Sequence, residues 1–270
     1  MNIEESIEKY KEIGLKQQFA LAKTCQDIIL YKIAKSGFGD HVTIKGGVVI
    51  MNMSNDNRRA TRDLDLDFIK YSLEDVSIKR FIDKLNSVPD NIQLEITGPI
   101  EVMKQQDYKG KRVNIYITDK TGAKYKFKLD LGVHKNLALE QEELCFDLNS
   151  SLESVTLFVN SKEQIVAEKL KSLLKHGVVS TRFKDIFDIY YFTNINKVDV
   201  EKLKELIIDY ILNDRKMYEN TFDDIYRRLN LIFSDEAYKE RLKTKKDDNW
   251  LGIPENDVIQ TVLKFFENLK

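Results

Sequence analysis

The order of hydrophobic and polar residues divides the chain into a mixed first part and a helical second part. Apolar residues recur either with helical spacing or in short runs and alternations typical of strands. Strands are predicted in six stretches: 42–44, 64–69, 93–97, 112–118, 125–131 and 155–159. Helices are predicted at 3–36, 48–53, 72–87, 161–176, 182–192, 200–212, 222–233 and 254–269.

Capping and turn residues support several of these boundaries. Ser72 is expected to cap its helix, and Ser161 with Gln164 forms a capping box. The sequence from Asp119 to Gly122 predicts a hairpin turn. Since every predicted strand precedes residue 160, we expect an α+β fold with a mixed sheet and flanking helices at 1–160 and a helical domain at 161–270.

Carboxylates line one face of the predicted strand 64–69. The run from Asp63 to Phe68 alternates aspartate with a large apolar residue. Because side chains alternate across a strand, Asp63, Asp65 and Asp67 share one face, and the apolar residues pack on the other. Crowded carboxylates repel one another and need a cation nearby. Two interpretations are open here, a metal site and a solvated strand face.

Spacing along the strand decides which aspartates can share an ion. The Cα atoms of Asp63 and Asp65 are roughly 6.6 Å apart at about 3.3 Å per residue, and Mg²⁺ suits such oxygen ligands. Asp67 is roughly 13 Å from Asp63, so we expect it to be a structural partner of Arg62 or a cap. Asp130 ends the polar face of a later strand and is the expected third ligand and candidate base.

A glycine pair precedes the carboxylates. Gly46 and Gly47 follow a predicted strand and open a predicted helix. Backbone N–H groups at such a turn approach phosphate oxygens closely, and the helix dipole favours the negative charge. Together with the metal ligands, this predicts nucleotidyl transfer.

Composition narrows the class of protein further. The chain has 270 residues and a net charge of -1, which excludes a globally basic nucleic-acid coat. Cys25 and Cys145 have no metal-ligand spacing, so we expect reduced thiols. The chain shows no signal peptide and no apolar run of the ~18 residues that a membrane span needs. We therefore expect a soluble, cytoplasmic protein without a membrane partner.

These motifs resemble a known family. The order Gly46-Gly47, then Arg59, Thr61, Asp63 and Asp65, then Asp130 resembles the nucleotidyltransferase superfamily. More narrowly, it resembles the AbiEii/AbiGii toxins of bacterial abortive-infection toxin–antitoxin pairs. The segments 167–170 and 182–188 strengthen the resemblance, which covers residues 40–192.

The resemblance implies further site residues. Nucleotide-binding roles are implied for Gly46, Gly47, Arg59, Thr61, Arg182, Lys184 and Asp188. Catalytic roles are implied for Asp63, Asp65, Asp130, Lys169 and Asp185, the first three as ligands of Mg²⁺ or Mn²⁺. The helical domain would close the active-site cleft. One departure is Gly47-Val48, where superfamily members usually have Ser or Thr at or just after the second glycine.

The implied reaction transfers a nucleoside monophosphate from a nucleoside triphosphate to a hydroxyl of an RNA, such as tRNA, and releases pyrophosphate. An antitoxin protein is the implied partner. A lysine-rich strand face near 124–128, with Lys109, Lys111 and Arg112, is either solvated or a track for a phosphate backbone. The alternatives are modification of a small molecule or a protein, and an inactive module that binds nucleotide or a partner.

Overall fold

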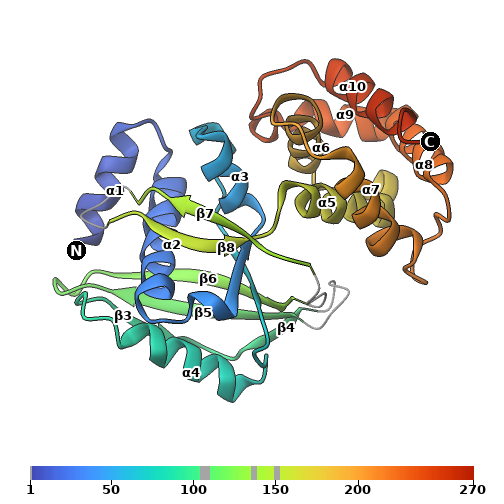
Figure 1. The fold of residues 1–270 in the computed structure, drawn as a ribbon. Coiled ribbons are helices and arrows are strands. Elements are labelled where there is room, and N and C mark those ends of the chain that lie inside the picture. Colours follow the sequence, from blue (N-terminus) through green and yellow to red (C-terminus); the bar gives the residue numbers. More distant parts are fainter. Residues whose placement is uncertain (1, 104–109, 135–138, 149–152) are drawn as a thin grey trace. The chain divides into compact units, whose positions relative to one another are not determined.

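The computed structural model describes residues 2–103, 110–134, 139–148 and 153–270. The chain divides into two compact units, Met1–Asn160 and Ser161–Lys270. The first unit contains a mixed sheet with helices, and the second is helical (Figure 1). Ten α-helices are present in the described part of the chain. No helix in the described ranges is long and apolar enough to cross a membrane.

The first unit alternates strands with a few helices. Its helices are α1 (Ile3–Glu12), α2 (Gln17–Lys35), α3 (Gly47–Ser54) and α4 (Asp75–Asn86). Its strands are β1 (Val42–Lys45), β2 (Leu64–Phe68), β3 (Gln93–Ile96), β4 (Glu101–Met103), β5 (Gly110–Thr118), β6 (Lys124–Val133), β7 (Glu142–Phe146) and β8 (Val155–Val159).

All eight strands form one mixed sheet. The strand order is β3-β5-β6-β2-β1-β8-β7, and β4 also pairs with β5. The pairs β1·β8 and β2·β6 are parallel, whereas β1·β2 and β5·β6 are antiparallel. The sheet therefore places β1, β2 and β6, three strands that are distant in sequence, side by side at its centre.

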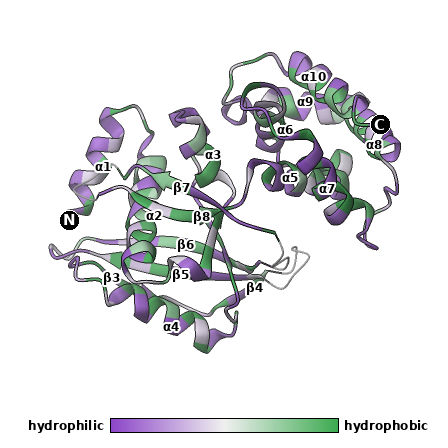
Figure 2. Cartoon of the chain, in the orientation of Figure 1, coloured by the Kyte–Doolittle hydropathy of each residue, from purple (hydrophilic) through white to green (hydrophobic). Residues whose placement is uncertain are grey.

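The two faces of this sheet differ in polarity. One face carries the fully buried side chains Leu66, Leu129 and Ile115, and helices α2 and α4 pack on it (Figure 1). Helix α4 shows alternating green and purple bands, as expected for a helix with one buried side (Figure 2). The opposite face carries the aspartates of β2 and β6. Burial of the apolar face thus forces the carboxylates to the polar one.

Several predicted boundaries in this unit are wrong. The predicted helix 3–36 is two helices, because Gly14 adopts φ 97° between them. Helix α4 starts at Asp75, since Ser72 accepts a hydrogen bond from the Glu74 N–H, outside the helix. The short strands β4 and β7 were not predicted. Strand β8 has the predicted bounds, and β2, β5 and β6 differ from their predicted bounds by one or two residues at an end.

The second unit is a helical bundle. Its α-helices are α5 (Lys162–His176), α6 (Lys184–Tyr190), α7 (Val200–Ile207), α8 (Phe222–Ser234), α9 (Glu236–Thr244) and α10 (Glu255–Glu267). Helices α6 and α7 continue into π-helical turns at Tyr191–Ile195 and Ile208–Leu212. Helix α9 was not predicted, and α6 begins two residues later than expected. Helix α10 packs against α6 and α8.

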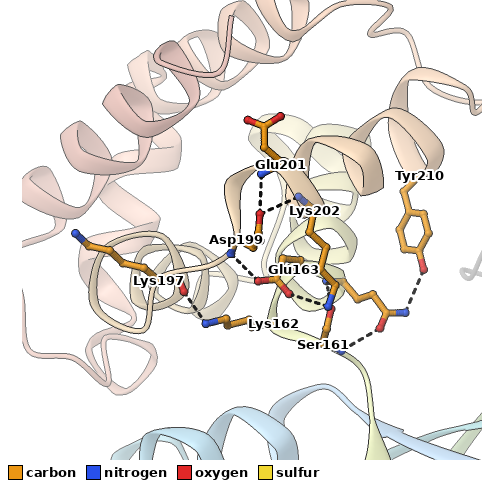
Figure 3. A network of polar contacts seen from close by, with 9 residues as sticks. Ser161, Lys162, Glu163, Lys197, Asp199, Glu201, Lys202 and Tyr210 are labelled. Atoms are coloured by element: carbon orange, nitrogen blue, oxygen red, sulfur yellow. Dashed lines mark hydrogen bonds and ion pairs between the residues drawn. The ribbon is translucent and has the colours of Figure 1, made fainter. Parts of the chain in front are cut away.

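A polar network joins the starts of α5 and α7 (Figure 3). The predicted capping box of Ser161 and Gln164 is present. Glu163, which is 1% exposed, accepts a hydrogen bond from the Asp199 N–H at 2.8 Å. Asp199 in turn caps α7 by accepting from the N–H groups of Glu201 and Lys202. Two helix starts are thereby held together by backbone groups that would otherwise lack partners.

Candidate active site

A row of four charged residues crosses the polar face of the sheet. In the strand register Lys45 lies opposite Asp65, Asp65 lies opposite Asp130, and Asp130 lies opposite Arg112. We call these four residues the carboxylate row. Neighbouring strands are about 4.8 Å apart, so Asp65 and Asp130 are brought together although 65 positions separate them in the sequence. The predicted association of these two aspartates is present.

Cations pair with the aspartates around Asp65. Arg112 makes a two-pronged contact with Asp130, with Nε to Oδ1 at 2.8 Å and Nη2 to Oδ2 at 2.7 Å. Lys128 Nζ lies 2.8 Å from Asp63 Oδ1. These contacts show why crowded carboxylates are tolerated here, since each outer one has its own cation.

Asp67 belongs to the same face but has a structural environment. Its carboxylate pairs with Lys45 Nζ at 2.8 Å, and both side chains are largely buried. The expected structural role of Asp67 therefore fits the structure, but the cation is Lys45 and not Arg62. A buried polar pair also speaks against a freely solvated strand face.

Asp65 is the central carboxylate. Burial raises its pKa to about 6, and although the charge of Lys45 lowers it, the carboxylate of Asp130 raises it further. The carboxylate of Asp65 makes no hydrogen bond or ion pair with any of the residues that the structure describes. The central position of the face therefore carries a negative charge that the surrounding cations do not offset.

The glycine turn lies directly against these residues. Gly46 has φ 72°, and a Cβ atom there would meet Asp65 Oδ2 at 2.6 Å. A Cβ atom on Gly47 would meet the Thr61 Cβ at 2.8 Å and its Oγ1 at 2.9 Å. Both glycines are thus required by close approach, and α3 begins at Gly47 beside the carboxylates. Thr61 places a hydroxyl where the side chain of residue 47 would lie.

Buried residues support the segment before β2. Gln26, which is fully buried, donates from Nε2 to the carbonyl oxygens of Thr61 and Asp63 at 3.0 and 3.3 Å. Arg59 is 4% exposed and lies in a 3-10 turn, Asn57–Arg59. Arg59 is therefore a buried residue of the segment that leads into β2. Gln26 was not predicted as a site residue, because its role depends on tertiary contacts with backbone atoms.

Lys169 lies in the second unit between two carboxylates. Its Nζ lies 2.5 Å from Asp185 Oδ1 and 2.9 Å from Asp188 Oδ2. Asp188 is fully buried and accepts a hydrogen bond from Trp250 Nε1 at 3.0 Å. We call Lys169, Asp185, Asp188 and Trp250 the Lys169 cluster. Trp250 was not predicted to take part.

The residues implied for binding and catalysis in segment 182–188 differ in burial. Lys184 and Asp185 are partly exposed, but Asp188 is buried because it points toward Lys169 and Trp250. Arg182 is exposed and precedes the helix. Asp188 therefore contacts other side chains within the second unit.

The basic residues that could form a track for a phosphate backbone lie on two faces of the sheet. Arg112 and Lys128 lie on the aspartate face, whereas Lys111 is on the opposite face and pairs with Asp75 at 2.6 Å. Lys124 pairs with Glu95 at 2.8 Å. Lys109 lies outside the described residues. The basic residues therefore do not form one continuous stripe.

A hard divalent cation fits the chemistry of this donor set. Asp63, Asp65 and Asp130 supply carboxylate oxygens on adjacent strands, and such oxygens are the ligands that Mg²⁺ prefers. Within the described ranges no three acidic, histidine or cysteine side chains converge on one ion position. The reason is visible in the ion pairs, since Asp63 and Asp130 are turned toward Lys128 and Arg112.

The mixed sheet, the glycine turn and the paired carboxylates together have the form of a nucleotidyl transferase site. A comparison with known families agrees with this class. Residues 28–257 match the family described as nucleotidyl transferase AbiEii toxin, Type IV TA system. The chain therefore belongs to the AbiEii family of nucleotidyl transferase toxins. No curated protein matches the chain.

The family match extends beyond the motifs. It continues to residue 257, whereas the resemblance found in the sequence ended at residue 192. Helices α7, α8 and α9 and the segment that carries Trp250 thus belong to the family region, whereas most of α10 lies beyond it. Membership of a type IV toxin–antitoxin family of nucleotidyl transferases implies a nucleoside triphosphate as substrate and an antitoxin as partner.

Proposed function

We propose that this chain transfers a nucleoside monophosphate from a nucleoside triphosphate to a hydroxyl group of an RNA, with tRNA as the acceptor. The toxic effect would follow from blocking that RNA, and the antitoxin would oppose it. The observation that carries the proposal is the register pairing of Asp65 with Asp130 beside the Gly46–Gly47 turn.

The chain's own groups have distinct roles in this proposal. The N–H groups at Gly46 and Gly47 hold phosphate oxygens, and the Thr61 hydroxyl assists at the same turn. Asp63, Asp65 and Asp130 would bind Mg²⁺ or Mn²⁺, which supplies positive charge at the α-phosphate and the leaving group. From the family resemblance, Lys169 and Lys184 steady the polyphosphate or the acceptor, with Asp185 orienting Lys169.

The proposed chemical step is a displacement at phosphorus. The acceptor oxygen forms a bond to the α-phosphorus, and the bond from that phosphorus to the oxygen bridging to the β-phosphate breaks. Pyrophosphate leaves with the electron pair. The proton of the acceptor hydroxyl passes to the carboxylate of Asp130.

A labelling experiment tests the proposal. The purified chain is incubated with Mg²⁺, each of the four α-labelled nucleoside triphosphates and total cellular RNA. Asp65→Asn serves as the inactive variant and Asp83→Asn, on the exposed side of α4, as the matched control. We expect label in small RNA from wild type and Asp83→Asn only.

Other acceptors are distinguished in the same assay. Label in added protein or in small molecules, but not in RNA, would contradict the RNA acceptor and retain the transferase. Absence of label in every fraction would contradict the transferase activity of this chain itself.

A further inference from the structure

Asp130 is fully engaged by Arg112. Both of its carboxylate oxygens accept hydrogen bonds from the guanidinium, at 2.8 and 2.7 Å. The two residues are register partners on β5 and β6, so the contact follows directly from the strand pairing. The guanidinium occupies one lone-pair site on each oxygen, and its positive charge makes the carboxylate a weaker base and a poorer ligand for a second cation. The proposed reaction is therefore favoured when Arg112 leaves Asp130.

The ion pairs of Asp63, Asp67 and Asp130 differ in exposure. The side chains of Lys45 and Asp67 are 13% and 6% exposed. Arg112 is 36% exposed, and Lys128 and Asp63 are 33% and 44% exposed. Separating a buried pair leaves buried charges without partners, whereas a partly exposed cation can move to water or to another anion. Lys45 is thus a permanent partner, and Arg112 and Lys128 are exchangeable.

The charges of the face support this division. Three cations, Lys45, Arg112 and Lys128, form ion pairs on this face, and four carboxylates lie there, namely Asp63, Asp65, Asp67 and Asp130. Release of Arg112 and Lys128 removes two positive charges from the carboxylates. One divalent cation would restore the same two charges.

We propose that Arg112 and Lys128 are stand-in counter-ions, which occupy the carboxylates until a divalent cation binds and which then bind the polyphosphate of the substrate. This inference rests on the proposed function, because it assigns partners to the same site. The planar guanidinium matches phosphate oxygens as well as it matches a carboxylate. Arg112 is therefore a positioning residue whose partner changes during binding.

The exchange predicts opposite effects on two ligands. Loss of Arg112 removes the competitor of the metal but also a ligand of the polyphosphate. In Arg112→Gln, we expect the affinity for Mn²⁺ alone to rise several-fold. The affinity for inorganic tripolyphosphate, measured at saturating Mg²⁺, should fall about tenfold, which is the effect of losing about 1.4 kcal/mol of binding free energy.

The experiment uses the full chain. Free Mn²⁺ is counted by electron paramagnetic resonance, and tripolyphosphate binding is followed by calorimetry. Lys111→Gln is the matched control, since Lys111 is the neighbouring residue but pairs with Asp75 on the other face. The control should leave both affinities unchanged. Arg112→Lys retains the positive charge but cannot make the bidentate contact of a guanidinium. We expect its affinities for Mn²⁺ and for tripolyphosphate to lie between those of wild type and Arg112→Gln.

Three outcomes would overturn the inference. Arg112→Gln could bind Mn²⁺ no more tightly than wild type, or it could bind tripolyphosphate as well as wild type does. If Arg112→Gln does not fold, Lys128→Gln, at the other exchangeable ion pair, is measured in its place. Tighter Mn²⁺ binding together with weaker tripolyphosphate binding is expected there too, and absence of that combination contradicts the proposal. Wild type that binds no Mn²⁺ is a separate result, which contradicts the metal assignment of the proposed function.

Discussion

The carboxylate row and the Lys169 cluster combine the same residue types in opposite ways. In the carboxylate row, Asp65 is half-buried and has no ion pair within the described part of the chain. Arg112, which pairs with the neighbouring Asp130, is 36% exposed. In the cluster, Asp188 is fully buried between Lys169 and Trp250. The first arrangement leaves the carboxylate of Asp65 available to a ligand, and in the second the carboxylate of Asp188 is taken up by partners within its own unit.

This difference shows that a charged residue's role depends on its burial and partners more than on its type. Burial without enough counter-charge raises the pKa of Asp65 to about 6. Such destabilised groups are typical of functional sites. Complete burial with two partners, as for Asp188, is typical of structural support.

The largest expected effect is on catalysis in the first unit. Asp65→Asn should lower transfer of labelled nucleotide by on the order of 10³-fold, because a charge that acts on the reacting phosphate is lost. Its free energy of unfolding without metal should be equal to that of wild type or higher, since repulsion with Asp130 is removed. Chemical denaturation on the same preparation measures this. A variant that unfolds more easily would contradict the comparison.

The opposite result is expected for the second unit. Asp188→Asn breaks a buried ion pair and leaves Lys169 with one carboxylate fewer. We expect the free energy of unfolding to fall by about 3–5 kcal/mol. Denaturant unfolding followed by Trp250 fluorescence is the measurement, because Trp250 is the only tryptophan. Asp223→Asn, at an exposed pair with Arg227, is the control and should change stability by under about 1 kcal/mol.

A smaller effect is expected at the glycine turn. A methyl group on Gly47 would meet Thr61 at 2.8 Å, so Gly47→Ala should cost about 1–3 kcal/mol of stability. In a Thr61→Gly background the contact is absent, and the added cost of Gly47→Ala should be much smaller. A double-mutant cycle by denaturation measures the coupling. Additive effects would show that these two positions do not touch.

The smallest expected effect is on the pH dependence of stability. The pKa of Asp65 in the folded protein is raised from 3.8 to about 6, so its contribution to stability is present at low pH and is lost as pH rises through about 6. Asp65→Asn lacks this change. We therefore compare the melting temperature of the variant with that of wild type across this titration. The difference, variant minus wild type, should increase from pH 4 to pH 6 and stay constant at higher pH. A flat difference would contradict the raised pKa.

Much of the sheet could be predicted because its strands alternate clearly. Strands β2 and β6 place apolar residues on one face and aspartates or lysines on the other, and that pattern follows from the pleat. Strands β4 and β7 lack this alternation of apolar and polar residues. They lie at the edges of the sheet, where most of their side chains are partly or fully exposed, so few apolar residues are needed. The break between α1 and α2 was not predicted, because the helical spacing of apolar residues continues across Gly14. The break depends on the positive φ angle of this one residue.

The aspartates of the site could be predicted, but their partners could not. Asp65 and Asp130 follow from strand faces, whereas the cations beside them depend on the register between strands. Lys45 and Arg112 become neighbours of these aspartates only when β1, β2, β6 and β5 pair. The contact of Trp250 with Asp188 likewise joins residues 62 positions apart. No local pattern marks such contacts.

The most direct test of the account is hydrogen exchange of the full chain with and without Mg²⁺, in the absence of nucleotide. The account predicts slower exchange in β1, β2 and β6 of wild type on adding Mg²⁺, and no change around Lys169 in α5 or Asp188 in α6. Asp65→Asn should show no response to Mg²⁺. Two results would contradict the claim that the carboxylate row is the metal-binding part of this enzyme. One is slower exchange around Lys169 and Asp188 in place of the three strands, and the other is the same effect of Mg²⁺ on Asp65→Asn as on wild type.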